Sequence, residues 1–238
     1  MTVRIAEIYT SIQGEGRYTG EASVFVRASG CNLRCWYCDT PYASWRPEGE
    51  DLSVDEIVAE VLEHDAEHVV LTGGEPMLFA ELVPICRHLK EAGRIITIET
   101  AGTLHLSLAC DLMSISPKLS NSSPIASRSP NSVEGGAGGW NERHERTRHA
   151  PSVIRRLVDE YDYQFKFVID TPEDCDEVTD YLKEFPEVPR HHVWMMPQGT
   201  DLEQLKATSD WLEPWCRTHG YHYCPRKQIE WFGLVRGT

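Results

Sequence analysis

Three cysteines with the spacing of metal ligands lie close together in the sequence. Cys31, Cys35 and Cys38 form a C-x₃-C-x₂-C triplet, so their thiolates can reach one metal centre from a single loop. Structural zinc normally takes a fourth Cys or His ligand at matching spacing, and no second CxxC pair occurs in the chain. The triplet therefore favours a [4Fe–4S] cluster in which one iron has no protein ligand.

Three further segments stand where apolar strands are expected to end. They are Gly73-Gly74-Glu75-Pro76, Ser116-Pro117-Lys118 and Met196-Pro197-Gln198-Gly199. Ligands of parallel α/β folds bind at the carboxyl ends of strands, and glycines there let the backbone approach a ligand closely. Taken alone, the first segment is also compatible with an ordinary strand-to-helix turn.

Strand and helix patterns alternate along most of the chain, which predicts parallel βα units. Six units of roughly 30 residues need about 180 residues, so we expect an α/β fold with a partial (βα)₆ TIM-like barrel. Ser53 and Glu56 form a capping box at one helix start, and Gly93 is an expected helix stop. The expected strands are 3–9, 22–28, 68–72, 95–99, 112–116, 163–169 and 192–196, and the expected helices are 53–68, 76–92, a short one near Leu106, 151–161, 172–184 and 201–218.

Residues 120–150 interrupt this alternation within what we expect to be a single domain, 1–238. Ser, Pro and Gly dominate the first part of the segment and charged residues the second. This composition predicts a surface-loop insert that is partly disordered. His144 and His149 have a spacing that fits no compact metal site, so a solvated linker is the better interpretation.

The bulk composition limits the classes of function. The chain has 238 residues, 41% of them apolar, and a formal net charge of −14, which argues against a nucleic-acid surface. The first ten residues lack the pattern of a signal peptide, and no apolar run approaches the roughly 20 residues of a membrane span. We expect a cytoplasmic protein, in which the five scattered cysteines are small core residues.

The cysteine triplet, with an aromatic residue before its last member, resembles the radical S-adenosylmethionine (SAM) superfamily. The resemblance implies that the open iron chelates SAM, which is cleaved by one electron to methionine and a 5′-deoxyadenosyl radical. Tyr37 would lie against the adenine, although plain packing is an alternative, and Gly74 and Glu75 would bind the SAM amino group. The remaining SAM contacts would come from Ser116, Lys118, Met196, Pro197, Gln198 and Gly199.

Motifs that flank the triplet resemble the 7-carboxy-7-deazaguanine synthase family. Gln13-Gly14-Glu15-Gly16 and Cys38-Asp39-Thr40 carry most of this resemblance, which covers nearly the whole chain apart from 120–150. It implies ring contraction of 6-carboxy-5,6,7,8-tetrahydropterin to 7-carboxy-7-deazaguanine with release of ammonia, in queuosine and related 7-deazapurine biosynthesis. Thr40 would be the one protein ligand of an assisting Mg²⁺, which suits hard oxygen ligands, unless its hydroxyl only bonds to the backbone.

The substrate calls for partners along the pterin edge and an anchor for its carboxylate. Glu15 can accept from the pterin amino group, and Arg27 can hold the carboxylate through a bidentate fork unless it is only a surface ion pair. Family members often carry a histidine in the last strand where this chain has Gln228, and His222 is the alternative equivalent. The expected substrate contacts are Ile12, Gln13, Gly14, Glu15, Arg27, Thr72, Gln228 and the C-terminal Thr238.

Other functions remain open on the sequence. A radical SAM activase of a glycyl radical enzyme would carry the same triplet, but the QGEG and CDT motifs are not expected there. A zinc-binding interaction module and a radical SAM enzyme acting on another pterin or purine are further alternatives. The resemblance implies a flavodoxin- or ferredoxin-type electron donor and a homodimer, with no nucleic acid or membrane as partner.

Overall fold

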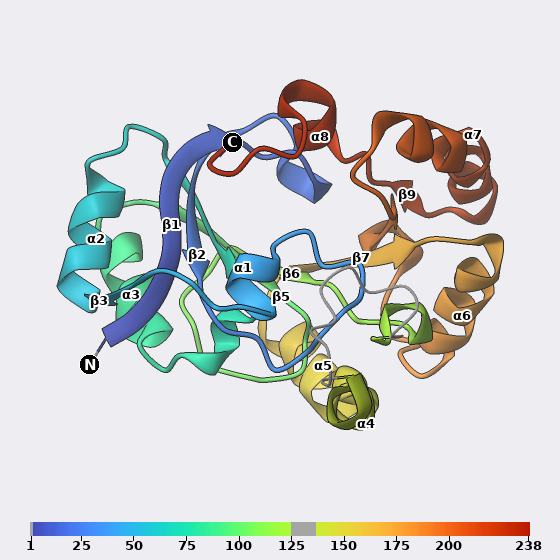
Figure 1. The fold of residues 1–238 in the computed structure, drawn as a ribbon, viewed down its shortest axis with the longest axis horizontal. Coiled ribbons are helices and arrows are strands. Elements are labelled where there is room, and N and C mark those ends of the chain that lie inside the picture. The colour runs from blue at the N-terminus through green and yellow to red at the C-terminus, as the bar shows by residue number, and fades with distance from the viewer. Residues whose placement is uncertain (1, 125–136) are drawn as a thin grey trace.

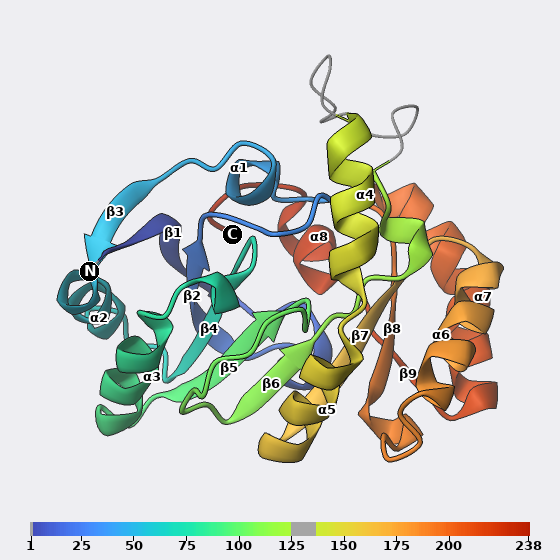
Figure 2. The same ribbon diagram turned by 90° about the horizontal axis from the view of Figure 1, so that it is seen from below.

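Nine strands form one curved, mostly parallel sheet in the computed structural model, which describes residues 2–124 and 137–238 (Figures 1 and 2). The sheet order is β3-β1-β2-β4-β5-β6-β7-β8-β9, and β1 runs antiparallel to both its neighbours while the other pairs are parallel. The expected partial (βα)₆ barrel is confirmed. The strands are β1 Thr2–Ile12, β2 Ala22–Ala28, β3 Glu50–Ser53, β4 His68–Gly73, β5 Ile95–Thr100, β6 Leu112–Ile115, β7 Tyr163–Ile169, β8 Val193–Pro197 and β9 His222–Tyr223.

Helices connect most of the successive parallel strands, β5 and β6 excepted, and cover the outer face of the sheet (Figure 2). The predicted capping box starts α2: the Ser53 amide donates to Glu56 Oε2 at 2.8 Å, and the Glu56 amide donates to Ser53 Oγ at 3.3 Å. The α-helices are α1 Pro41–Ser44, α2 Val54–Leu62, α3 Leu82–Glu91, α4 Ala137–Arg148, α5 Pro151–Glu160, α6 Pro172–Lys183, α7 Leu202–His219 and α8 Lys227–Phe232, and the 3₁₀ turns are η1 Gly16–Tyr18, η2 Pro76–Leu78, η3 Ser120–Ser122 and η4 Arg190–His192.

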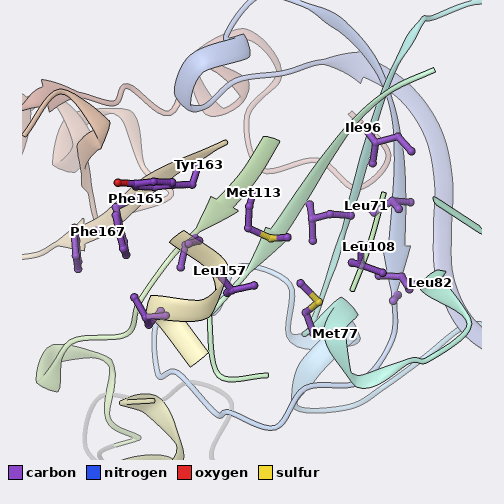
Figure 3. Packing of buried hydrophobic residues seen from close by; sticks show 14 of the residues in the cluster. Leu71, Met77, Leu82, Ile96, Leu108, Met113, Leu157, Tyr163, Phe165 and Phe167 are labelled. Carbon is purple, nitrogen blue, oxygen red and sulfur yellow. The ribbon is translucent and has the colours of Figure 1, made fainter. Parts of the chain in front are cut away.

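Side-chain alternation along the strands separates an apolar outer face from a polar inner one. Phe165 and Phe167 are fully buried and stack at 5.8 Å, with Met113 and Leu157 in the same core (Figure 3). Lys166 stands between the two phenylalanines and therefore points to the opposite face. Because residues in register on neighbouring parallel strands lie side by side, the inward-facing polar side chains of all these strands lie close together on the inner face of the sheet.

Three predicted helices differ from the structure. The helix expected over 53–68 ends at Leu62. The helix expected over 76–92 is divided into η2 and α3, because Phe79 has extended backbone angles (φ −111°, ψ 110°). No helix forms near Leu106. There the hydroxyl of Tyr161 accepts from the Leu108 amide at 2.8 Å and donates to the Leu106 carbonyl at 3.2 Å. These two backbone groups, which would bond to other backbone groups in a helix, are therefore bonded to a side chain.

The interpretation of 120–150 as a solvated linker is wrong for its described part. Residues 120–122 form η3 and 137–148 form the helix α4, on which His144 is completely buried. The sequence of α4 has no apolar periodicity, so nothing in its pattern indicated a buried face. The remaining predicted loop residues, 125–136, lie outside the described part of the chain.

No helix within the described ranges is both long enough and apolar enough to cross a bilayer.

Candidate active site

A cavity of about 800 Å³ lies on the inner face of the sheet, toward the carboxyl ends of the parallel strands. Its wall is built from segments far apart in the sequence, from Glu7 in β1 to the C-terminal residues. Of the 21 residues predicted to form the site, 19 line the cavity. These are Ile12, Gln13, Gly14, Glu15, Arg27, Cys31, Cys35, Tyr37, Cys38, Thr40, Thr72, Gly74, Ser116, Lys118, Met196, Pro197, Gln198, Gln228 and Thr238, whereas Glu75 and Gly199 do not line it.

The three thiols of the triplet share one end of this cavity. Burial raises the pKa of Cys31 to about 12 and also raises the pKa values of Cys35 and Cys38. The thiols of Cys31 and Cys38 raise the Cys35 pKa further, which places the three groups within electrostatic reach of one another. Buried thiols bind a metal only as thiolates, so a cationic iron centre would compensate the charge that burial disfavours.

The donor set of this loop fits an iron–sulfur cluster, although the arrangement of ligands is not that of a single ion. Within 2–124 and 137–238, no three Cys, His, Asp or Glu side chains are arranged to hold one metal ion. The case for a cluster therefore rests on three clustered thiols and on the family relationship given below.

The glycine that follows β4, Gly74, lets the backbone pack closely beside the start of the cysteine loop. A Cβ on Gly74 would lie 2.2 Å from the carbonyl oxygen of Gly30, so only glycine fits there. Glu75, predicted to bind SAM, is instead fully buried behind the cavity wall. Its carboxylate accepts from the amides of Met77 (3.1 Å) and Ala101 (2.8 Å) and from Thr100 Oγ1 (2.8 Å). Through these bonds Glu75 connects the loops after β4 and β5, and its side chain does not line the cavity.

The loops after β6 and β8 close the same end of the cavity. Lys118 Nζ donates at 2.7 Å to both the carbonyl and the hydroxyl oxygen of Ser116. Gly199 does not line the cavity, and its carbonyl accepts from Arg226 Nη1 at 2.5 Å. Of the 196–199 segment, only the first three residues line the cavity.

An ion-pair network that sequence reasoning missed forms the floor of the cavity. Lys166 Nζ lies 2.9 Å from both Glu15 Oε2 and Glu99 Oε1, and its side chain is only 4% exposed. Burial by itself would raise the Glu15 pKa, but the charges of Lys166 and Arg226 lower it to about 2. The signal was present in the sequence, since a single lysine between two phenylalanines in an apolar strand is unusual.

Arg226 joins three loops around this floor. Its guanidinium pairs with Glu15 (3.4 Å) and with Asp39 of the CDT motif, besides the carbonyl of Gly199. Thr40, the next residue, has its hydroxyl 3.8 Å from Cys38 Sγ. The turn after β1, the cysteine loop and the loop after β8 are therefore held together by one buried cation.

Arg27 lies in the cavity wall and is already paired. Its Nε donates to Glu7 Oε1 at 2.6 Å and its Nη2 donates to the Tyr9 hydroxyl at 3.0 Å. The side chain is 14% exposed, so this is a buried pair and not the surface ion pair that the sequence left open. Glu7 and Tyr9 fix the plane of the guanidinium.

The structure separates the two alternatives, and it places Gln228 on the helix α8 instead of in the expected last strand. Gln228 lines the cavity and donates through Nε2 to Glu15 Oε1 at 2.6 Å, whereas His222 is exposed and stacks on Trp194 at 4.4 Å. Among the described residues, Gln228 Oε1 is a buried acceptor without a hydrogen-bond partner. Of the two alternatives, Gln228 therefore lies in the cavity and His222 does not.

The last residues of the chain reach the cavity mouth. Thr238 lines the cavity and its hydroxyl donates to the Val235 carbonyl at 2.8 Å. Arg236 secures this segment by pairing with Glu7 (3.3 Å) and stacking over Tyr42 at 4.2 Å.

Comparisons with known proteins agree with this geometry. Residues 25–118 match the model of the radical SAM superfamily. The crystal structure of QueE from Escherichia coli has a similar fold, with a TM-score of 0.64, 20% identity and 94% of each chain covered. The 7-carboxy-7-deazaguanine synthases of Rhodopirellula baltica and Halobacterium salinarum are 43% and 42% identical, over 98% and 94% of this chain and 88% of each relative. The chain therefore belongs to the 7-carboxy-7-deazaguanine synthase family.

Proposed function

We propose that this cavity converts 6-carboxy-5,6,7,8-tetrahydropterin into 7-carboxy-7-deazaguanine with release of ammonia, in 7-deazapurine (queuosine) biosynthesis. The observation that carries the proposal is the pairing, in one cavity, of three clustered thiols with a floor of buried charged groups. A bound [4Fe–4S] cluster with SAM supplies a 5′-deoxyadenosyl radical that abstracts hydrogen from the substrate. The protein's own residues bind and orient the two ligands and keep water from the reaction.

In this proposal the thiol end of the cavity holds the cluster and SAM. Cys31, Cys35 and Cys38 bind iron, and Tyr37, which is buried beside them, lies against the adenine. The backbone at Gly74 offers polar groups to the methionine part of SAM. Ser116, Lys118, Met196, Pro197 and Gln198 complete the SAM site from the loops after β6 and β8.

The charged end holds the pterin. Because its pKa is about 2, Glu15 remains a carboxylate at neutral pH and can accept from the pterin amino group. The unpartnered Oε1 of Gln228 offers a second acceptor for the same edge of the pterin. Arg27 and the C-terminal Thr238 bind the rest of the substrate, with Ile12, Gln13, Gly14 and Thr72 as further contacts.

Thr40 is the proposed protein ligand of Mg²⁺. Thr40 lines the cavity two residues after Cys38, so its hydroxyl would hold the cation, which would supply positive charge for the substrate carboxylate. Asp39 is engaged by Arg226, which leaves the neighbouring hydroxyl as the oxygen donor of the CDT motif.

We further propose a cytoplasmic homodimer that receives its electrons from a flavodoxin- or ferredoxin-type donor. The family relationship supports these assignments, and the net charge of −14 makes nucleic acid an unsuitable partner. Sedimentation of the reconstituted protein tests the dimer, and reduction by purified flavodoxin in place of dithionite tests the donor.

An anaerobic assay tests the proposed reaction. The reconstituted protein is incubated with SAM, dithionite, Mg²⁺ and 6-carboxytetrahydropterin, and the products are identified by mass spectrometry. We expect 7-carboxy-7-deazaguanine without an equivalent loss of SAM. Release of 5′-deoxyadenosine without the deazaguanine would contradict the substrate and favour an activase or another heterocycle.

Changing Arg27→Lys should raise the KM for the pterin roughly tenfold or more, because a lysine keeps a cation beside Glu7 but loses the fork that holds a carboxylate. SAM binding, followed by titration, should remain unchanged. Arg4→Lys is the matched control, since Arg4 pairs with Asp51 on the exposed side of β1. Equal KM values for the two variants would remove Arg27 from the substrate site.

A further inference from the structure

Helix α4 lies against the cysteine loop, although its sequence suggested only a linker. Figure 2 shows α4 beside the loop that follows β2, and hydrogen bonds connect the two segments. His144, near the end of this helix, is completely buried. Neither its burial nor its contacts enter the proposed reaction, so they call for a separate explanation.

Both ring nitrogens of His144 are bonded. Nδ1 accepts from the backbone amide of Arg34 at 3.1 Å, and Nε2 lies 2.8 Å from the hydroxyl of Ser122. An amide can only donate, so Nδ1 carries no proton and Nε2–H donates to Ser122 Oγ. The Ser122 hydroxyl in turn donates to the Leu119 carbonyl at 2.6 Å. The imidazole must therefore be neutral, and burial lowers its pKa to about 4.

The 3₁₀ turn η3, to which His144 is bonded, also holds the part of the loop between the second and third cysteines. The carbonyl of Ser122 accepts from the Trp36 amide at 3.2 Å, and the carbonyl of Asn121 accepts from Trp36 Nε1 at 2.6 Å. Arg34 lies between the first and second cysteines and Trp36 between the second and third. His144 and η3 thus hold both peptide segments that set the distances between the thiols.

The side chain of Arg34 adds to this arrangement. Its Nη1 donates to the carbonyls of Cys31 (2.8 Å) and Leu33 (2.7 Å), and its guanidinium lies 3.9 Å above the ring of Trp140, one turn before His144 on α4. The helix therefore contacts the cysteine loop through both the backbone and the side chain of one residue.

We propose that His144 is a positioning residue for the iron–sulfur cluster, which fixes the cysteine loop by accepting the Arg34 amide. This inference rests on the proposed function only in that the loop binds a cluster. Without the acceptor, a buried amide loses its partner and the loop gains conformations in which the thiols do not converge. The cluster should then assemble less completely and lose iron faster.

The test compares His144→Phe with His144→Asn. Phenylalanine keeps the ring but has no acceptor, whereas asparagine places Oδ1 close to the position of Nδ1. After anaerobic reconstitution the wild type should hold about four iron atoms per chain, and His144→Phe should lose iron to a ferrous chelator roughly tenfold faster. His144→Asn should restore most of the difference, and the electron paramagnetic resonance spectrum of the reduced cluster should broaden only in the phenylalanine variant.

Arg146→Ala is the matched control, because Arg146 is exposed on the same helix. Circular dichroism of the apoproteins checks folding, and if His144→Phe does not fold, the comparison of His144→Asn with His144→Ala decides. If His144→Phe, or His144→Ala in its place, lost iron no faster than the Arg146→Ala control, the inference would be overturned. These measurements need no pterin. A wild type that binds iron normally but does not form the deazaguanine would therefore contradict the proposed reaction and leave this inference intact. A wild type that takes up no iron would overturn both.

Discussion

Changing Cys35→Ala should remove nearly all iron and abolish SAM cleavage. The cavity wall supplies three thiols to the cluster, and two ligands from one loop cannot retain it. Cys35 is the most buried of the three, so no outside ligand can easily take its place. The measurements are iron and acid-labile sulfide per chain and release of 5′-deoxyadenosine under dithionite. Cys31→Ala and Cys38→Ala should behave in the same way.

Cys110→Ala provides the control, because this thiol lies outside the cavity. It should load iron and cleave SAM as the wild type does. Full activity in Cys35→Ala would contradict the assignment of the cluster ligands. Zinc in place of iron in the purified wild type would support the alternative of a zinc-binding module.

Changing Lys166→Met should lower the free energy of unfolding at pH 7 by about 3–5 kcal/mol and abolish turnover. The substitution preserves the length of the side chain but leaves Glu15 and Glu99 facing each other without the cation between them. A buried charge pair costs most when one partner is removed, because the remaining charge is neither solvated nor compensated. Urea unfolding and the deazaguanine assay measure the two effects.

The loss of stability should depend on pH. In the wild type the Glu15 pKa is about 2, below its ordinary value of 4.5, so its contribution is fully present above 4.5 and disappears as the pH falls toward 2. In Lys166→Met the Glu15 carboxylate takes up a proton at higher pH, because only Arg226 is left to oppose its protonation. The difference in unfolding free energy between wild type and variant should therefore shrink between pH 4.5 and pH 2.

Two variants serve as controls for this prediction. Lys183→Met removes a lysine that is 73% exposed and paired with Asp180, and it should change stability by at most about 0.5 kcal/mol. The double variant Lys166→Met with Glu99→Gln should regain part of the lost stability, since it removes one of the two uncompensated charges. Equal stability of Lys166→Met and Lys183→Met would show that the network does not stabilise the fold.

Local patterns were sufficient for most of the fold. Alternating strands and helices predicted the parallel sheet, and the capping residues Ser53 and Glu56 and the stop at Gly93 were found where expected. Each of these features depends on neighbours in the sequence. The failures near Leu106 and in α4 involve segments whose hydrogen bonds or buried faces are supplied by distant residues, such as Tyr161 and the cysteine loop.

The sequence by itself determined the cysteine triplet and the motifs at the strand ends, because residues in one loop or at the ends of parallel strands have few ways to be arranged. Only the tertiary structure decided which side chains meet. Lys166 joins Glu15, 151 residues away, and His144 meets Arg34 across 110 residues. It also decided that Gln228 lines the cavity and that His222 and Glu75 do not. The physical reason is that periodicity reports which face of an element is buried, whereas the partner of a buried charge depends on how distant elements pack.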